Sequence, residues 1–132
     1  MVDHVYSTNS SEINFLKRFY GFSDEGTVTG HLYVDQQPET IPLFRLYGIG
    51  RTDHLYTTSI GERDHAVKRL GYTVVEIVGY VYGSEGPGRV PLYRLHNMGA
   101  HDHYYTTSAY QRDDAARNGW VVEGVAGYMF PL

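Results

Sequence analysis

The sequence has 132 residues, 42% of them hydrophobic and 20% charged, which fits one globular domain with an apolar core, residues 1–132. A net charge of −4, without a run of Lys or Arg, argues against nucleic acid as a partner. The absence of cysteine excludes disulfides and thiolate metal sites, and no stretch approaches the ~18 consecutive apolar residues that membrane insertion requires.

An Asp-His-x-Tyr motif occurs three times and organises the chain. The copies begin at Asp3, Asp53 and Asp102. They divide the domain into repeat units of about residues 3–50, 51–99 and 100–132. One unit of this size buries too little apolar surface to fold alone, so we expect the three units to share one core.

A short helix is predicted after each copy of the motif. The signal is a hydroxyl or amide side chain followed three positions later by Glu or Gln, as in a capping box. The pairs are Asn9 with Glu12, Ser59 with Glu62, and Ser108 with Gln111. Each helix is expected to end at a glycine that adopts a left-handed conformation. The three glycines are Gly21, Gly71 and Gly119.

Strands are predicted after the helices and before the second and third copies of the motif. The first kind is entered through a glycine, namely Gly30, Gly79 or Gly127. The second kind comprises residues 42–47 and 91–96, and each leads through a Gly-bearing turn into the next Asp-His. These segments predict two complete hairpins, with turns at residues 48–52 and 97–101. Strand alternation puts Phe44 and Leu46 on one face, and Arg45 and Tyr47 on the other.

Together, these elements predict an α+β fold. We expect a single domain of three pseudo-symmetric repeats, in which antiparallel β-strands carry three short helices. A glutamate also recurs after each helix, at Glu25, Glu76 and Glu123. These glutamates could act as acids or bases in glycoside cleavage, or they could pair with Arg45 and Arg94 and link the repeats.

The phrases PLYRL, DHYYTTS and EGVAGY carry a resemblance to a known family. The sequence resembles the tandem repeat of a widespread domain family of unknown function, found in bacterial surface proteins and in fungi. The resemblance covers nearly the whole chain and is closest over residues 91–130, whereas copy one departs most, with Ser7 in place of Thr. The resemblance implies recognition of a ligand or a cell wall, and a stand-alone member would be lectin-like.

Neither a metal site nor an active site is expected from the motif. Adjacent Asp and His residues of a strand point to opposite faces, whereas a transition metal needs three or four convergent ligands. His101 and His103 could bind a metal weakly, but copy two has Thr52 where copy three has His101. The sequence has no Cys nucleophile and no Gly-x-Ser-x-Gly elbow, and a repeated residue set suits binding better than catalysis. We therefore expect no enzymatic activity, no metal and no cofactor.

We expect the protein to be a lectin with two or three weak, repeated sites for glycans or glycoconjugates. Sugar hydroxyls pair with Asp, Asn, His and Arg, while sugar C–H faces stack on aromatic rings. The predicted ligand-binding residues are Arg45, Tyr47, Asp53, His54 and Tyr56 in one hairpin, and Arg94, His96, Asn97, Asp102, His103 and Tyr105 in the other. The alternative is a structural or protein-binding surface module, in which Asp caps the turn and His fills a half-buried strand position.

The start of the chain gives the expected location. The first six residues have no basic segment followed by an apolar stretch, so they do not form a signal peptide. We expect a cytoplasmic protein, or one released without a signal peptide. An extracellular location is expected if a signal peptide has been removed.

Overall fold

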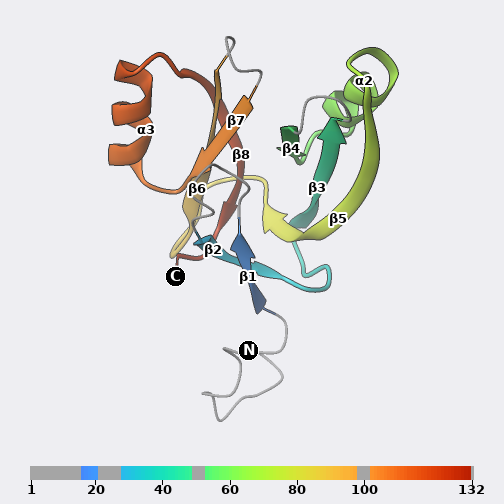
Figure 1. Ribbon diagram of the computed structural model, residues 1–132. Helices are drawn as coiled ribbons and strands as arrows, with labels where there is room; N and C mark the ends of the chain where they lie inside the picture. The colour runs from blue at the N-terminus through green and yellow to red at the C-terminus, as the bar shows by residue number, and fades with distance from the viewer. Residues whose placement is uncertain (1–15, 21–27, 49–52, 98–101, 132) are drawn as a thin grey trace.

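The computed structural model describes residues 16–20, 28–48, 53–97 and 102–131, which form one continuous antiparallel sheet and two helices. The elements in chain order are β1 Leu16–Tyr20, β2 Val28–Tyr33, β3 Thr40–Gly48, β4 Asp53–Thr57, α2 Ile60–Arg69, β5 Tyr72–Tyr82, β6 Val90–Asn97, β7 Asp102–Thr106, α3 Ala109–Arg117 and β8 Val121–Met129. The strands run in the order β1-β2-β5-β8-β6-β7, while β3 pairs with β4 and β5. The sheet curls into a half-barrel (Figure 1).

The expectation of an α+β fold with three pseudo-symmetric repeats and three short helices is wrong. The described chain is mostly antiparallel sheet and has two helices. The end of the first predicted helix is instead strand β1, which pairs with β2 from Leu16, opposite Tyr33, to Tyr20, opposite Val28. Phe19 of β1 is 4% exposed, and its ring packs edge-on against that of Tyr56 at 5.0 Å. A local capping pattern could not anticipate this strand partner.

Two parts of the chain are built alike. We call β3, β4, α2 and β5 (residues 40–82) the first hairpin unit, and β6, β7, α3 and β8 (residues 90–129) the second. Arg45 lies opposite Tyr56 in one hairpin and Arg94 opposite Tyr105 in the other, so the two predicted hairpins are confirmed. In Figure 1 the first unit stands on the right and the second on the left, with β1 and β2 below them.

The predicted starts and ends of the second and third helices are also confirmed. The hydroxyls of Ser59 and Ser108 accept the backbone N–H of the residue three positions later, which caps α2 and α3. Gly71 and Gly119 follow the helices with φ of 81° and 97°, as expected of a left-handed stop. Neither helix of the described chain is long and apolar enough to span a membrane. Residues Asn9, Glu12 and Gly21 lie outside the described residues.

The core has two parts, one on each face of the sheet. The inner part lies within the curl and is shared by both units. It consists of Phe19, Leu32, Leu43, Tyr56, Val81, Leu92, Tyr105, Ala126 and Met129. The outer part lies beneath α2 and consists of Phe44, Leu46, Leu55, Ala66 and Tyr72. The predicted alternation of β3 is thus confirmed, because Phe44 and Leu46 pack outward under the helix.

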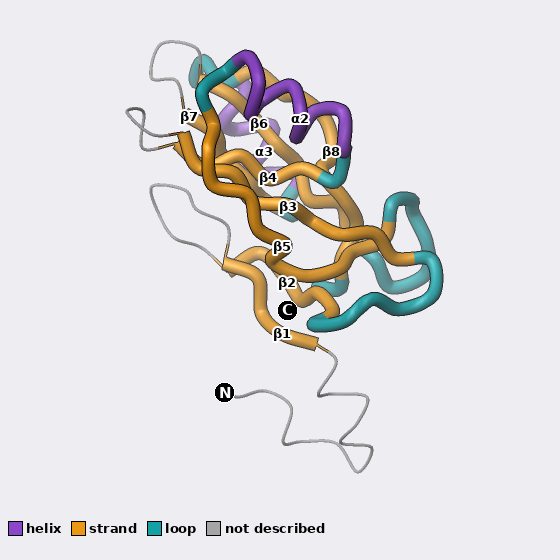
Figure 2. The backbone as a smooth tube through the Cα atoms, turned by 90° about the vertical axis from the view of Figure 1, so that its right-hand side faces the viewer, coloured by secondary structure: helices purple, strands orange, loops and turns teal. Residues whose placement is uncertain are grey.

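The prediction that Gly30, Gly79 and Gly127 begin strands is wrong, because they lie within β2, β5 and β8, close to where these strands cross. A Cβ atom on Gly79 would lie 2.8 Å from the carbonyl oxygen of Tyr33, and one on Gly127 would lie 2.7 Å from Cγ2 of Val81. A side chain at Gly79 would therefore displace the backbone of β2, and one at Gly127 would displace the side chain of Val81. In the backbone view of Figure 2, β2 and β5 lie next to each other near the described C-terminal end.

Candidate functional site

The inner face of each unit carries one arginine, one glutamate and a row of aromatic rings. In the first unit Tyr47 lies opposite His54, and Arg45 lies between Tyr56 and Glu76 on the neighbouring strands. We call this set the Arg45 site. The second unit brings together the equivalent set, which we call the Arg94 site. It comprises Arg94, His96, His103, Tyr105 and Glu123.

The Arg45 site is open to solvent. The guanidinium of Arg45 forms an ion pair with Glu76, and their side chains are 32% and 44% exposed. Beside this pair lies a cavity of about 370 Å³ between β1, β3 and β5. Its lining consists of Lys17, Arg18, Phe19, Leu32, Arg45, Tyr56, Glu76, Ile77 and Val78. On the same face the rings of Tyr47 and His54 lie 4.9 Å apart.

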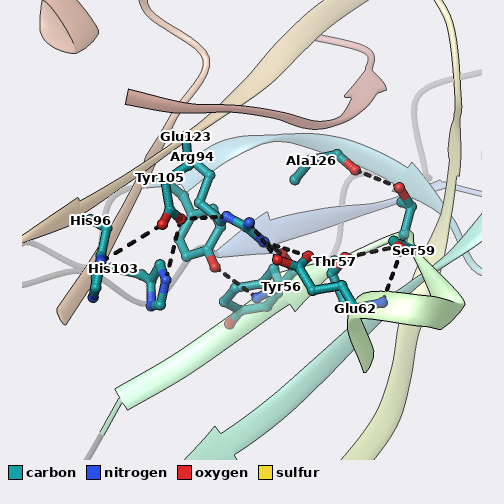
Figure 3. A network of polar contacts seen from close by, with 11 residues as sticks. Tyr56, Thr57, Ser59, Glu62, Arg94, His96, His103, Tyr105, Glu123 and Ala126 are labelled. Carbon is teal, nitrogen blue, oxygen red and sulfur yellow. Dashed lines mark hydrogen bonds and ion pairs between the residues drawn. The ribbon is translucent and has the colours of Figure 1, made fainter. Parts of the chain in front are cut away.

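The Arg94 site is closed by hydrogen bonds (Figure 3). The two terminal nitrogens of Arg94 donate to Glu62 at 2.9 and 2.6 Å, and Nε donates to Glu123 at 2.9 Å. Nη1 also donates to the carbonyl oxygen of Tyr56 at 3.2 Å. The side chain of Arg94 is 14% exposed, and the adjoining cavity is about 120 Å³. Arg94 therefore ties α2 and β4 of the first unit to β8 of the second.

Charge in the Arg94 site is stabilised by this bonding rather than by solvent. Burial alone would lower the pKa of Arg94, but the hydrogen bond to Glu62 and the nearby negative charges raise it. Burial alone would raise the pKa of Glu62, but hydrogen bonds from Arg94 and Thr57 together with the charge of Arg94 lower it. Both side chains therefore remain ionised at neutral pH.

Two histidines stack beside Glu123. The rings of His96 and His103 lie 4.6 Å apart with an angle of 18° between their planes. Nδ1 of His96 is 3.7 Å from Oε2 of Glu123, and Nε2 of His103 is 3.4 Å from Oε1. Figure 3 shows both rings directed at this carboxylate. The donor atoms of the three side chains all lie within 4.8 Å of one another, so the cluster could hold a metal ion.

A β-bulge places Glu123 in this position. Arg94 pairs with Gly124 and the next residue, Leu95, pairs with Val122, so Glu123 is an extra residue in β8. Gly124 has φ of 131°, a conformation that favours glycine. In the first unit Glu76 lies in regular register opposite Arg45. The bulge thus gives the second unit a carboxylate that serves Arg94 and the histidines together.

The structure places the other predicted ligand-binding residues as follows. Tyr56 and Tyr105 are 0% and 1% exposed, and they pack in the core with ring centroids 4.9 Å apart. The backbone N–H of Tyr56 donates to the hydroxyl of Tyr105 at 2.7 Å. Asn97 is half-buried at the end of β6. The side chains of Asp53 and Asp102 lie outside the described part of the structure.

The sequence analysis left open whether the recurring glutamates act as acids or bases or pair with Arg45 and Arg94, and the structure pairs Arg45 with Glu76 and Arg94 with Glu123. It missed Glu62, whose carboxylate it assigned to a capping box. The hydroxyl of Thr57 accepts the N–H of Ser59 instead, which leaves the carboxylate of Glu62 to bind Arg94. The sequence analysis also missed the pairing of His96 with His103. The hairpin predicted around residues 97–101 brings the two strands together, but the register that sets the two histidines opposite each other comes from the structure.

Comparison with known proteins identifies the family. The fold and sites define a protein built from β-hairpin units with an arginine–glutamate pair on the inner face of each. The chain belongs to the family of a domain of unknown function (DUF5648), which matches residues 1–130. Membership of an uncharacterised domain family is thus confirmed. Neither a curated protein nor a solved structure matches the chain significantly.

Proposed function

We propose that the protein is a non-enzymatic carbohydrate-binding protein whose principal site is the cavity beside Arg45. The observation that carries the proposal is the lining of this cavity, which combines ionic with apolar side chains. Sugars need both, because their hydroxyls pair with charged groups and their C–H faces rest on apolar or aromatic surface. The volume of about 370 Å³ is at the low end of the range for small-molecule sites, about 300–1,000 Å³.

The ionic part of the lining is accessible to a ligand. Arg45 and Glu76 remain about one third and nearly one half exposed while they pair with each other. An ion pair this exposed contributes little to stability, so exchange of one of its hydrogen bonds with a sugar hydroxyl costs little. Lys17 and Arg18 of β1 are exposed and add donors along the opposite rim.

The apolar part of the lining is well packed. Phe19 is held edge-on against Tyr56, and both side chains are buried at the base of the cavity. Ile77, which is 50% exposed, offers apolar surface at the rim. A base whose side chains are already packed lowers the entropic cost of ordering them when a ligand binds.

The lining favours binding over hydrolysis. Glycoside cleavage uses a pair of carboxyl groups that flank one bond. Among the described residues of the cavity lining, Glu76 is the one carboxylate. The Arg94 site has a smaller cavity, and its arginine is bonded to two carboxylates and a carbonyl oxygen, so we assign Arg94 a structural role and place no sugar there. The proposal thus has one principal site in place of two or three equal ones.

Protein binding is a second candidate function, and exposed apolar side chains at equivalent places in the two units favour it. Val75 and Ile77 are 42% and 50% exposed, and Val122 and Val125 are 44% and 42% exposed. Val75 lies opposite Leu46, and Val122 lies opposite the equivalent Leu95. Such a repeated apolar edge suits a protein partner.

An array of immobilised glycans tests the proposal first, with the full chain as probe. The best soluble glycan is then titrated calorimetrically into the wild type and into Arg45→Met and Glu76→Gln. We expect each variant to weaken binding at least about tenfold, or about 1.4 kcal/mol. Arg69→Met is the matched control, because Arg69 is an exposed arginine in the last turn of α2. Binding to no glycan, or equal affinity in Arg45→Met, would overturn the proposal.

A further inference from the structure

We propose that His96, His103 and Glu123 bind one divalent transition-metal ion, with Zn²⁺ as the representative ion. This inference replaces the sequence-based expectation of no metal, which considered His101 rather than His96 as the partner of His103. It concerns the second hairpin unit and does not rest on the carbohydrate site of the first unit.

The distances between the donor atoms suit a metal. Zinc binds imidazole nitrogen at about 2.0–2.1 Å and carboxylate oxygen at about 2.0–2.2 Å, so neighbouring ligands of a tetrahedral ion lie roughly 3.4 Å apart. The separations from His103 and from His96 to the carboxylate oxygens of Glu123 are 3.4 and 3.7 Å. All three donor atoms lie within 4.8 Å of one another. Binding therefore needs a small contraction of the cluster, together with a rotation of one ring out of the stack.

The backbone holds the three ligands in place. His96 and His103 are directly opposed on β6 and β7, and opposed residues of antiparallel strands have Cβ atoms about 4.5–5.5 Å apart. The bulge in β8 supplies Glu123 from a third strand. Arg94 donates to the same carboxylate at 2.9 Å, which fixes its orientation, as outer partners do in metal sites.

The charge around the cluster permits a dication. Glu62 and Glu123 contribute two negative charges and Arg94 one positive charge, which leaves an excess of one negative charge among these side chains. The bidentate pair with Glu62 offsets the positive charge of the Arg94 guanidinium, which would otherwise repel the metal ion. Because the side chains of His103 and His96 are 9% and 20% exposed, the ion would be partly shielded from water.

The first unit offers no equivalent set among its described side chains. At the places of His96, His103 and Glu123 it has Tyr47, His54 and Glu76. One imidazole is thus replaced by a phenol, a poor ligand for zinc at neutral pH because its pKa is about 10.

In the second unit, two histidines and one glutamate supply three ligands of a tetrahedral ion. The fourth position would be filled by water or another small oxygen ligand.

Calorimetric titration of Zn²⁺ into the full, tag-free chain after treatment with a chelator tests the proposal. We expect one ion per chain. His96→Tyr is the sharpest variant, because it installs the residue found at the equivalent position of the first unit and should preserve the fold. His96→Tyr, His103→Ala and Glu123→Gln should each weaken binding at least about tenfold. His65→Ala is the matched control, since His65 is exposed on α2 and should not affect binding.

Two further measurements make the result unambiguous. Circular dichroism of each variant establishes that it is folded, so that a loss of binding reports the loss of a ligand. Substitution by Co²⁺ should give visible absorption bands of a four- or five-coordinate ion in the wild type and not in His96→Tyr. The proposal is overturned if folded His96→Tyr and His103→Ala bind Zn²⁺ as tightly as the wild type. It is also overturned if the wild type binds no ion.

Discussion

Arg45 and Arg94 occupy equivalent positions in the two hairpin units, yet their surroundings differ. Arg45 pairs with Glu76 at the edge of a cavity of about 370 Å³, and its side chain is 32% exposed. Arg94 is 14% exposed and bonded both to Glu123 of its own unit and to Glu62 of the other. The comparison teaches that arginines at equivalent strand positions can lie either beside an open cavity or in an internal link between the units.

One carboxylate of the internal link comes from the third position of a helix. Glu62 of α2 faces Arg94 and carries a charge. At the equivalent position of α3 the chain has Gln111, whose side-chain oxygen accepts from the hydroxyl of Thr106. Both residues fit a capping-box pattern, but only the carboxylate can neutralise a buried guanidinium.

The largest expected effect separates the two arginines. Arg94→Met should lower the free energy of unfolding by about 3–5 kcal/mol, because it leaves two partly buried carboxylates without their cation. Arg45→Met should lower it by about 0–1 kcal/mol, the scale of an exposed ion pair. Denaturation by urea measures both values. Equal losses would show that the two sites do not differ as described.

The link between the units can be weakened at a second point. Tyr105→Phe removes the hydroxyl that accepts the N–H of Tyr56, so a buried donor is left unpaired. We expect a loss of about 1–3 kcal/mol in the free energy of unfolding. Tyr104→Phe is the control, because the hydroxyl of Tyr104 forms an exposed hydrogen bond of 3.4 Å to Gln111. This variant should change the free energy of unfolding by less than about 0.5 kcal/mol.

The bulge that distinguishes the second unit can be tested at Gly124. Gly124→Ala meets no atom within 4 Å but places a Cβ on a backbone with φ of 131°. We expect a loss of about 1–3 kcal/mol in urea denaturation, together with weaker Zn²⁺ binding as Glu123 shifts. Gly61→Ala in the first turn of α2 should instead be neutral or stabilising by up to about 1 kcal/mol. Similar losses in the two variants would argue against a strained bulge.

The smallest expected effect is a dependence on pH. Because the pKa of Glu62 is lower in the folded than in the unfolded chain, its contribution to stability is present above the unfolded pKa, about 4.3. That contribution is lost as the pH falls through the folded pKa. Unfolding measured between pH 6 and pH 3 should therefore show a weaker pH dependence in Glu62→Gln than in the wild type. An unchanged pH dependence would contradict the assignment.

The comparison of units also shows what the sequence could predict. The alternation of Phe44, Arg45 and Leu46 gave the faces of β3 correctly, because strand periodicity is a local property. The hydroxyl caps of α2 and α3 are local for the same reason. Strand β1 was predicted as a helix, since its conformation depends on its pairing with β2.

The parts of the site that were missed depend on contacts between distant residues. Glu62 and Arg94 are 32 positions apart, and no pattern near either residue specifies the other. The bulge at Glu123 depends on the register of β8 against β6, which a single sequence does not fix. Burial of Tyr56 and Tyr105 follows from the curl of the sheet, so ligand contacts could not be distinguished from core packing beforehand.

The hydroxyl of Tyr105 has a consequence for solubility. In the described sheet β4 pairs with β3 alone, so its other edge presents backbone groups that a strand of another molecule could bind. Tyr105 occupies the N–H of Tyr56 on that edge, and Arg94 occupies the carbonyl oxygen of the same residue. Side chains of the second unit thus stand in for a neighbouring strand. A chain cut before β6 would expose this edge and should self-associate, whereas the intact pair of units protects it from aggregation.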